Sequence, residues 1–297
     1  PLLNLTKRTY TWDTLTGRFS LMRTSEIMGM SARFIEPSFD ALVDESFTGI
    51  ILTLPAQEAR LVVDEEDWPL ALAVRDGEAW NAASFLLRPP IIEVIERFEE
   101  LGGDVVHTTQ DEFMLAMREY YSLHILNNTL MAMEDLSPDR TAKVEELIAS
   151  VWKGRRGEEC MDCGCGSGMG SLALRNQGII PLAFDNDAGL IARGLHEGRL
   201  IPERTMCIDA TLLSHYARPV PLGLALMAGS IIDQTAMMWR AILEELFSMT
   251  RETLITVETE KEANMVRTWA LENEKNVEMF ENERDPFYDR WVCLVKD

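Results

Sequence analysis

The residues of this chain best placed to do chemistry gather in one segment, Asp162-Cys163-Gly164-Cys165-Gly166-Ser167-Gly168-Met169-Gly170. It follows a stretch typical of a strand and precedes one typical of a helix. Glycines at such a junction lack Cβ atoms, so the backbone can turn sharply and lie against a ligand. In open α/β sheets, ligands bind at the carboxyl ends of the strands. We therefore expect this loop to hold a cofactor.

The spacing of the glycines discriminates between cofactors. A dinucleotide-binding loop has the pattern G-x-G-x-x-G or G-x-G-x-x-A. Counted from Gly164, the last position of that pattern is Met169, and counted from Gly166 it is Ser171, so neither register fits. The pattern D-x-G-x-G-x-G fits without a mismatch, with Asp162 as its first residue. The spacing favours a ligand other than a dinucleotide.

This pattern resembles motif I of the class I S-adenosylmethionine-dependent methyltransferases. Further marks of that family follow in order: Asp185 ends the next predicted strand, Asp209 the one after it, and Ala228-Gly229-Ser230 the fourth. A closing β-hairpin completes the resemblance, which covers residues 141–297. It implies a methyltransferase with S-adenosylmethionine as cofactor and S-adenosylhomocysteine as product.

The resemblance also implies a set of cofactor-binding residues: Asp162, Gly164, Cys165, Gly166, Gly168, Asp185, Asn186, Asp209, Ala210 and Ala228. In that family the acid at Asp185 accepts hydrogen bonds from both ribose hydroxyls, and the acid at Asp209 accepts one from the adenine amine. Asp162 would support the loop or meet the amino group of the cofactor through water. A single aspartate at such a place is equally typical of a helix N-cap or a turn, and this alternative stays open for each.

The methyl acceptor is less clearly marked. Ser230 and Asp233 follow the fourth strand, where a substrate would reach, although Asp233 alternatively caps the next helix. Tyr120 and Tyr121, with Glu112, are further candidates for substrate contacts, and the core of a helix is their alternative location. DNA and many protein amide methyltransferases carry an Asn/Asp-Pro-Pro-aromatic sequence at the end of the fourth strand. This chain lacks that sequence, so methylation of adenine N6 or of a glutamine amide through it is disfavoured. No catalytic base is assigned, since in-line methyl transfer needs chiefly a near-attack geometry.

The three cysteines of the segment CMDCGC could suggest a metal site. Side chains alternate between the faces of a strand, so Cys160 and Cys163 should point in opposite directions. No second pair of cysteines or histidines at zinc spacing completes a set of ligands. We therefore expect no metal and interpret these residues as small buried thiols.

The elements that must position the loop divide the chain near residue 150. Residues 1–150 are expected to form a mostly helical domain that caps the cofactor and builds the substrate pocket. Apolar residues at helical spacing predict helices over 90–101, 110–126 and 138–152, the last opened by Ser137-Pro138-Asp139 as an N-cap followed by Pro at the first helical position. Two short stretches, 48–54 and 61–63, are predicted as strands.

Residues 151–297 alternate strands and helices, which predicts an α/β, Rossmann-like, mostly parallel sheet covered on both faces. The predicted strands are 159–163, 179–184, 205–208, 222–227 and 253–258, and the helices between them are 169–176, 188–197, 234–247 and 261–271. The last two strands, 277–281 and 290–295, are joined by a connection too short for a parallel crossover. They must form an antiparallel C-terminal hairpin.

Composition limits the partners. With 28 Lys and Arg against 49 Asp and Glu, the net charge is −21, which disfavours nucleic acid. A short basic group at Lys153, Arg155 and Arg156 is better interpreted as a helix C-terminus.

The longest apolar stretch, 222–232, is about half of what a membrane helix needs. Five cysteines do not form a disulfide framework. We expect a cytoplasmic protein that acts on a small molecule or a protein site, and a homodimer stays open.

Two other functions remain compatible with the sequence. One is a nicotinamide-dependent oxidoreductase on the same fold, against which the glycine spacing counts. The other is a non-catalytic module that binds adenosylmethionine, or binds a partner through residues 1–150.

Overall fold

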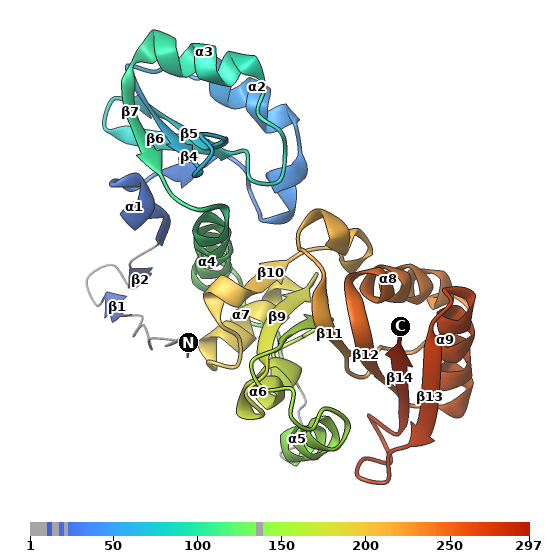
Figure 1. The fold of residues 1–297 in the computed structure, drawn as a ribbon. Coiled ribbons are helices and arrows are strands. Elements are labelled where there is room, and N and C mark those ends of the chain that lie inside the picture. Colours follow the sequence, from blue (N-terminus) through green and yellow to red (C-terminus); the bar gives the residue numbers. More distant parts are fainter. Residues whose placement is uncertain (1–10, 14–17, 21–22, 135–138) are drawn as a thin grey trace.

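The computed structural model describes residues 11–13, 18–20, 23–134 and 139–297. Ser137 and Pro138, which were expected to open a helix, lie outside these ranges. The short strands β1 (Thr11–Asp13) and β2 (Arg18–Ser20) pair with each other, and two larger sheets follow along the chain (Figure 1). No helix in the described ranges is both long enough and apolar enough to cross a membrane.

The N-terminal half contains a five-stranded sheet and is not mostly helical, so that prediction was wrong. Its strand order is β3-β6-β5-β4-β7, where β5 is antiparallel to both β4 and β6. These strands are β3 (Arg33–Phe34), β4 (Glu58–Val63), β5 (Pro69–Asp76), β6 (Ala79–Ser84) and β7 (Gly103–His107). Residues 70–74 of β5 are each at most 1% exposed. A strand buried on both faces shows no alternation of polar and apolar residues, so the period that identifies a strand is missing.

Two helices cover one face of this sheet, α2 (Ser46–Thr53) and α3 (Ile92–Leu101). The strand predicted at 48–54 is therefore wrong, because most of this segment belongs to α2. Thr48 and Ile51, one helical turn apart, are the buried residues of α2, and Ile51 joins the core of the sheet. The predicted strand at 61–63 lies within β4, and the predicted helix at 90–101 is α3.

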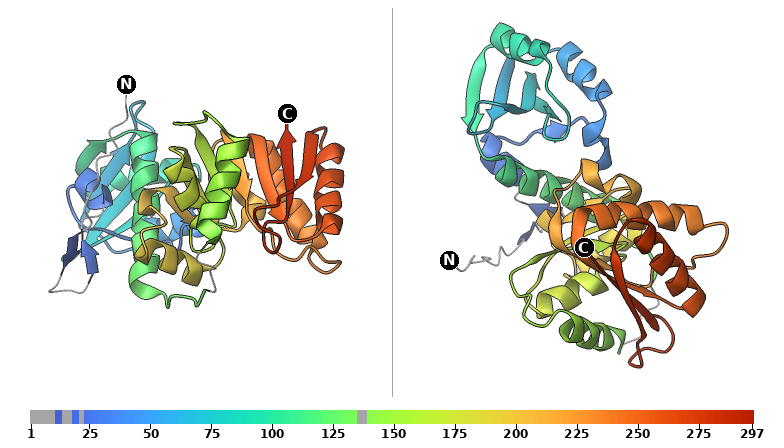
Figure 2. Two further views of the ribbon diagram at one scale, coloured as in Figure 1. Left: turned by 90° about the horizontal axis from the view of Figure 1, so that it is seen from below. Right: turned by 45° about the vertical axis from the view of Figure 1, so that its right-hand side comes forward.

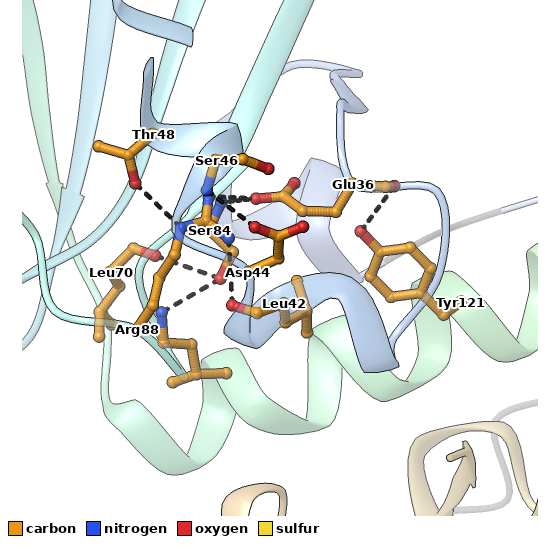
Figure 3. A network of polar contacts seen from close by, with 10 residues as sticks. Glu36, Leu42, Asp44, Ser46, Thr48, Leu70, Ser84, Arg88 and Tyr121 are labelled. Carbon is orange, nitrogen blue, oxygen red and sulfur yellow. Dashed lines mark hydrogen bonds and ion pairs between the residues drawn. The ribbon is translucent and has the colours of Figure 1, made fainter. Parts of the chain in front are cut away.

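A buried ion pair ties α2 to this sheet (Figure 3). The guanidinium of Arg88 donates to Glu36 Oε1 at 2.5 Å, to Thr48 Oγ1 at 3.1 Å and to the Leu42 carbonyl at 3.1 Å. Both charged side chains are at most 1% exposed. Burial raises the pKa of Glu36, and the charge of Arg88 opposes this shift. The network joins α2 and the 3-10 helix η1 (Asp40–Val43) to the end of β6.

The long helix α4 (Gln110–Asn128) connects the two halves (Figures 1 and 2). It begins at the N-cap Thr109, whose side chain accepts from the Glu112 amide. It packs against α1 (Arg23–Met28) on the N-terminal side. On the other side it contacts α7 (Ala188–His196), η2 (Pro202–Arg204) and β10 (Thr205–Cys207).

The second half is a seven-stranded sheet with the order β10-β9-β8-β11-β12-β14-β13. Strand β14 is antiparallel to both of its neighbours, which confirms the predicted C-terminal hairpin, and the other pairings are parallel. The strands besides β10 are β8 (Glu159–Cys163), β9 (Ile180–Asp185), β11 (Val220–Ala225), β12 (Thr250–Val257), β13 (Asn276–Glu281) and β14 (Trp291–Lys296). The chain leaves β8 for β9 on one side and reaches β11 on the other, so β8 and β11 flank the switch point.

Helices cover both faces of this sheet, as predicted. The helices α5 (Arg140–Val151) and α6 (Met169–Asn176) form a core with Cys160, Leu222 and Leu254 on one face. The opposite face packs against α8 (Ala236–Met249), α9 (Glu260–Glu272) and the 3-10 helix η3 (Ala210–His215). This arrangement leaves the carboxyl ends of β8, β9, β10 and β11 at one edge.

Candidate functional site

The glycine-rich loop is fastened to the end of β9. Its residues Gly164, Gly166 and Gly168 all have left-handed backbone conformations, with φ of 63°, 52° and 83°. The Cys165 amide donates to the Phe184 carbonyl at 3.0 Å. The Gly166 amide donates to Asp185 Oδ2 at 2.8 Å. The structure therefore brings together the loop and the acid that the sequence placed 19 residues further along.

Gly164 and Gly168 have different surroundings. A Cβ atom at Gly168 would lie 2.7 Å from the side chain of Leu200, so protein packs against this end of the loop. A Cβ atom at Gly164 would meet no atom within 4 Å from the described residues other than its neighbours in the chain. Gly164 therefore presents bare backbone to open space, where a ligand can approach it.

Asp162 lies beneath the loop and is only 2% exposed. Its Oδ2 accepts from Ser171 Oγ at 2.6 Å, and the carboxylate also accepts from the Ser171 amide in the first turn of α6. Burial raises the pKa of Asp162 to about 7, with a further contribution from the charge of Asp185. Asp162 thus supports the loop and α6 directly, one of the two roles expected for it.

This pKa predicts a pH dependence of stability. Between about pH 4 and pH 7, Asp162 keeps a proton in the folded state that the unfolded chain has lost. The free energy of unfolding should therefore fall as pH rises through this window and level off above it. Asp162→Asn should remove this slope. In urea denaturation, the free energy of unfolding of Asp162→Asn relative to the wild type should therefore rise by on the order of 2–4 kcal/mol from the acidic to the neutral end of the window. Asp233→Asn, an exposed control, should follow the wild type; parallel curves for all three proteins would contradict the assignment.

The acids at the ends of β9 and β10 both use part of their hydrogen-bonding capacity locally. Asp185 Oδ1 accepts from the Asp187 amide at 2.9 Å. Asp209 Oδ1 accepts from the amide and the hydroxyl of Thr211, so Asp209 is also the N-cap of η3. A carboxylate has about four acceptor positions, so each acid retains capacity toward a ligand. Asn186 and Asp209 are exposed and Ala210 is partly exposed at the same edge of the sheet.

The chain after β11 holds the other predicted residues. Ala228 is 4% exposed, and its amide donates to the Thr256 carbonyl of β12. Ser230 and Asp233 are exposed. The alternative that Asp233 caps the next helix is wrong, because α8 begins at Ala236 with Thr235 as its N-cap.

A cavity of about 490 Å³ opens at this edge, lined by Met227, Glu258, Phe287 and Tyr288. Met227 has a φ of 47°, a strained conformation for a residue with a side chain. Its amide donates to Thr256 Oγ1 at 2.7 Å, which in turn donates to the buried Asp289. None of the motifs in the sequence pointed to these residues. The positions of Met227 and Glu258, just after two neighbouring parallel strands, were a signal that could have found those two residues. The approach of Phe287 and Tyr288 from the hairpin loop left no signal in the sequence.

The two tyrosines proposed for substrate contact lie in the N-terminal half of the structure. The hydroxyl of Tyr121 donates to the Glu36 carbonyl, and that of Tyr120 accepts from the Phe34 amide. Tyr121 is 4% exposed, which agrees with the helix-core alternative. Tyr120 lines a separate cavity of about 410 Å³ beside Trp80, and the residues that line this cavity include none of the glycine-rich loop.

One segment of residues 1–150 does reach the start of α7. After α4, the Ala132 amide donates to the Gly189 carbonyl at 3.0 Å, and the Ala132 carbonyl accepts from Arg193 Nε. Glu134 pairs with Arg199 at 2.6 Å. This segment lies beside the helix that follows Asp185, so it is the part of the N-terminal half placed to border the site.

Cys160 and Cys163 are buried thiols on opposite faces of the sheet. Cys160 belongs to the core under α5 and α6, and Cys163 to the core of the opposite face, as the alternation of side chains predicted. All five cysteines are free. Burial raises the pKa of Cys163 and of Cys165, so both stay protonated and weakly nucleophilic at neutral pH. Among the described residues, no cluster of three or more His, Cys, Asp or Glu side chains could hold a metal ion.

No protein-family model and no curated protein matches this sequence. Solved structures that resemble it over part of its length include adenosylmethionine-dependent methyltransferases. The magnesium protoporphyrin IX methyltransferase of Synechocystis PCC 6803 is 14% identical with a TM-score of 0.45, over 62% of this chain and 97% of its own. The ribosomal protein L11 methylase of Lactobacillus delbrueckii subsp. bulgaricus is 14% identical with a TM-score of 0.42, over 54% and 79%. A TehB-like methyltransferase of Corynebacterium glutamicum is 20% identical with a TM-score of 0.40, over 52% and 87%. Similarities this low do not identify the substrate or the cofactor of this chain.

Proposed function

We propose that this protein is an S-adenosylmethionine-dependent methyltransferase. The observation that carries the proposal is the hydrogen bond from the Gly166 amide to Asp185 Oδ2. This hydrogen bond holds the glycine-rich loop next to Asp185, the acid at the end of β9, at the switch point of the sheet. A carboxylate fixed in this way can still accept from both hydroxyls of a ribose, while the bare backbone at Gly164 faces the ligand.

The charges around the loop favour a cationic cofactor over a dinucleotide. A pyrophosphate binds at the free amides of a helix N-terminus. Here the Asp162 carboxylate lies against the first turn of α6, where a Cβ atom at Gly170 would be 2.9 Å from Asp162 Oδ1. The Ser171 amide already donates to that carboxylate. Asp185, together with Asp162 when it is ionised, would repel a pyrophosphate and attract the ammonium and sulfonium groups of adenosylmethionine.

The chain itself would contribute chiefly positioning. When bound, adenosylmethionine supplies a methyl group on a good leaving group. The residues of this chain would then hold an acceptor in line with that methyl and exclude water. The cavity beside Met227 lies at the same edge of the sheet, and its apolar and aromatic walls with Glu258 suit a small molecule or a protein side chain as the acceptor.

Isothermal titration of the wild type with adenosylmethionine, adenosylhomocysteine and NAD tests the proposal. We expect heat with the first two ligands and none with NAD. Heat with NAD alone would replace the proposal with an oxidoreductase. Release of adenosylhomocysteine in the presence of candidate acceptors then distinguishes an enzyme from a non-catalytic module.

Gly164→Ala and Gly168→Ala form a matched pair for the same site. We expect Gly164→Ala to cost about 1–2 kcal/mol of stability, because its φ is positive, and to weaken adenosylhomocysteine binding roughly tenfold or more. Gly168→Ala should lose more stability, because its Cβ overlaps Leu200. Thermal unfolding and titration measure both effects. Unchanged affinity in a folded Gly164→Ala protein would remove this loop from the site.

A further inference from the structure

A third cavity lies at the opposite edge of the large sheet, where its parallel strands begin. Its volume is about 580 Å³, in the range of small-molecule sites. It is lined by residues at the beginning of β8 and β11, among them Glu159 and Val220, by Arg204 of η2, which directly precedes β10, and by the first half of α4. Strand β8 runs from Glu159 to Cys163, so the cavity and the glycine-rich loop are separated by about 13 Å of strand. The cavity is therefore distinct from the proposed cofactor site.

Arg118 is the unusual residue of this cavity. Its side chain is a member of the lining, yet the residue is only 8% exposed. Within the described part of the chain, its Nε has no hydrogen-bond partner. A buried charge is normally paired, because removing it from water costs several kcal/mol. Burial and, to a smaller extent, the charge of Arg204 lower the pKa of Arg118 to about 10, so Arg118 remains protonated at neutral pH.

The two acids that line the cavity form ion pairs with other arginines. Glu159 pairs with Arg204 at 2.5 Å, and Asp111 pairs with Arg218 at 3.5 Å. Both acids act on Arg118 only as more distant favourable charges. Three arginines and two acids leave the lining with an excess of one positive charge, in a chain whose net charge is −21. This local reversal of sign creates a place where an anion is stabilised.

The remaining lining is largely apolar and comes from both halves of the chain. Leu86 and Leu87 follow the N-terminal sheet, Met114 and Leu115 belong to α4, and Leu182 belongs to β9. A free inorganic ion would leave these walls uncovered. A molecule with one anionic group and an apolar body would pair with Arg118 and also cover the walls.

We propose that this cavity binds a small organic anion, with a phosphate or carboxylate group at Arg118 and an apolar body between α4 and the start of β11. The inference rests on the cavity, its charge balance and the buried Arg118 Nε without a hydrogen-bond partner, and it does not depend on the methyltransferase proposal. A ligand there would contact both the N-terminal half and the sheet that carries the glycine-rich loop.

The test uses the full chain and four probes: phenyl phosphate, benzoate, inorganic phosphate and benzyl alcohol. We expect phenyl phosphate or benzoate to bind, inorganic phosphate to bind more weakly, and benzyl alcohol not to bind. Which phenyl anion binds identifies the acid group. Arg118→Met should weaken that binding about tenfold or more, while Arg251→Met, an exposed control on β12, should leave it within about twofold. Excess adenosylhomocysteine should not compete.

A second measurement covers the case in which Arg118→Met does not fold. In the wild type, the Nε–Hε NMR signal of Arg118 should shift on addition of the anion that binds. The proposal is overturned if neither phenyl anion binds the wild type, if Arg118→Met binds as tightly as the wild type, or if the Arg118 signal stays unmoved at saturation. Competition by adenosylhomocysteine would also overturn it, because the anion would then occupy the cofactor site.

Discussion

Asp185→Ala should weaken the binding of adenosylmethionine and adenosylhomocysteine about 100-fold, or about 2.8 kcal/mol. Two effects combine in this variant. The ribose loses a charged acceptor, whose hydrogen bonds contribute about 1.5–3 kcal/mol each. The loop also loses the anchor for its Gly166 amide, so its conformation is no longer fixed before the ligand arrives. Titration calorimetry measures the affinity, and thermal unfolding measures the stability of the same sample.

Asp187→Ala is the matched control, two residues along the same turn. The Asp187 side chain accepts from the Gly189 and Leu190 amides and caps α7. Its loss should cost about 1 kcal/mol of stability and leave cofactor affinity within a few-fold. If both variants bind with the affinity of the wild type, Asp185 is only a turn residue. If both lose affinity equally, the effect comes from α7 and not from the ribose.

Arg88→Met should destabilise the protein by about 3–5 kcal/mol, because Glu36 would be left as a buried carboxylate without its counter-ion. Urea denaturation measures this loss. The loss should shrink at acid pH, since Glu36 can then enter the folded state protonated; burial already raises its pKa. Adding Glu36→Gln should recover part of the stability for the same reason.

Arg75→Met supplies the comparison within the same sheet. Arg75 pairs with Glu58 at 2.6 Å, but both side chains are more than a third exposed. Removing that pair should cost no more than about 1 kcal/mol. An equal effect of the two substitutions would mean that burial does not set the importance of the Arg88 pair.

The sequence predicted the second half of the fold because local patterns there agree with the tertiary structure. Strand β8 and helix α6 begin and end at the predicted residues, and the closing hairpin is antiparallel as its short connection required. The first half was misread for a physical reason. Strand β5 reads Pro-Leu-Ala-Leu-Ala-Val and is buried on both faces, so no period of two is present. The segment that became α2 is rich in β-branched residues, and packing of Thr48 and Ile51 outweighed that preference.

For the candidate site, the glycine spacing and the acids after two strands could be found in the sequence alone, because each depends on local backbone geometry. Their meeting through the Gly166 amide depends on β8 and β9 being neighbours. The cavity beside Met227 and the one around Arg118 depend on segments far apart in the chain.

The sequence by itself determined the glycine-rich loop, its acids and the strand-helix alternation around them. Only the tertiary structure decided the sheet of the N-terminal half, the burial of Asp162 and Arg118, and the charges that face them, because burial and distant charge arise from packing between segments that no local pattern records.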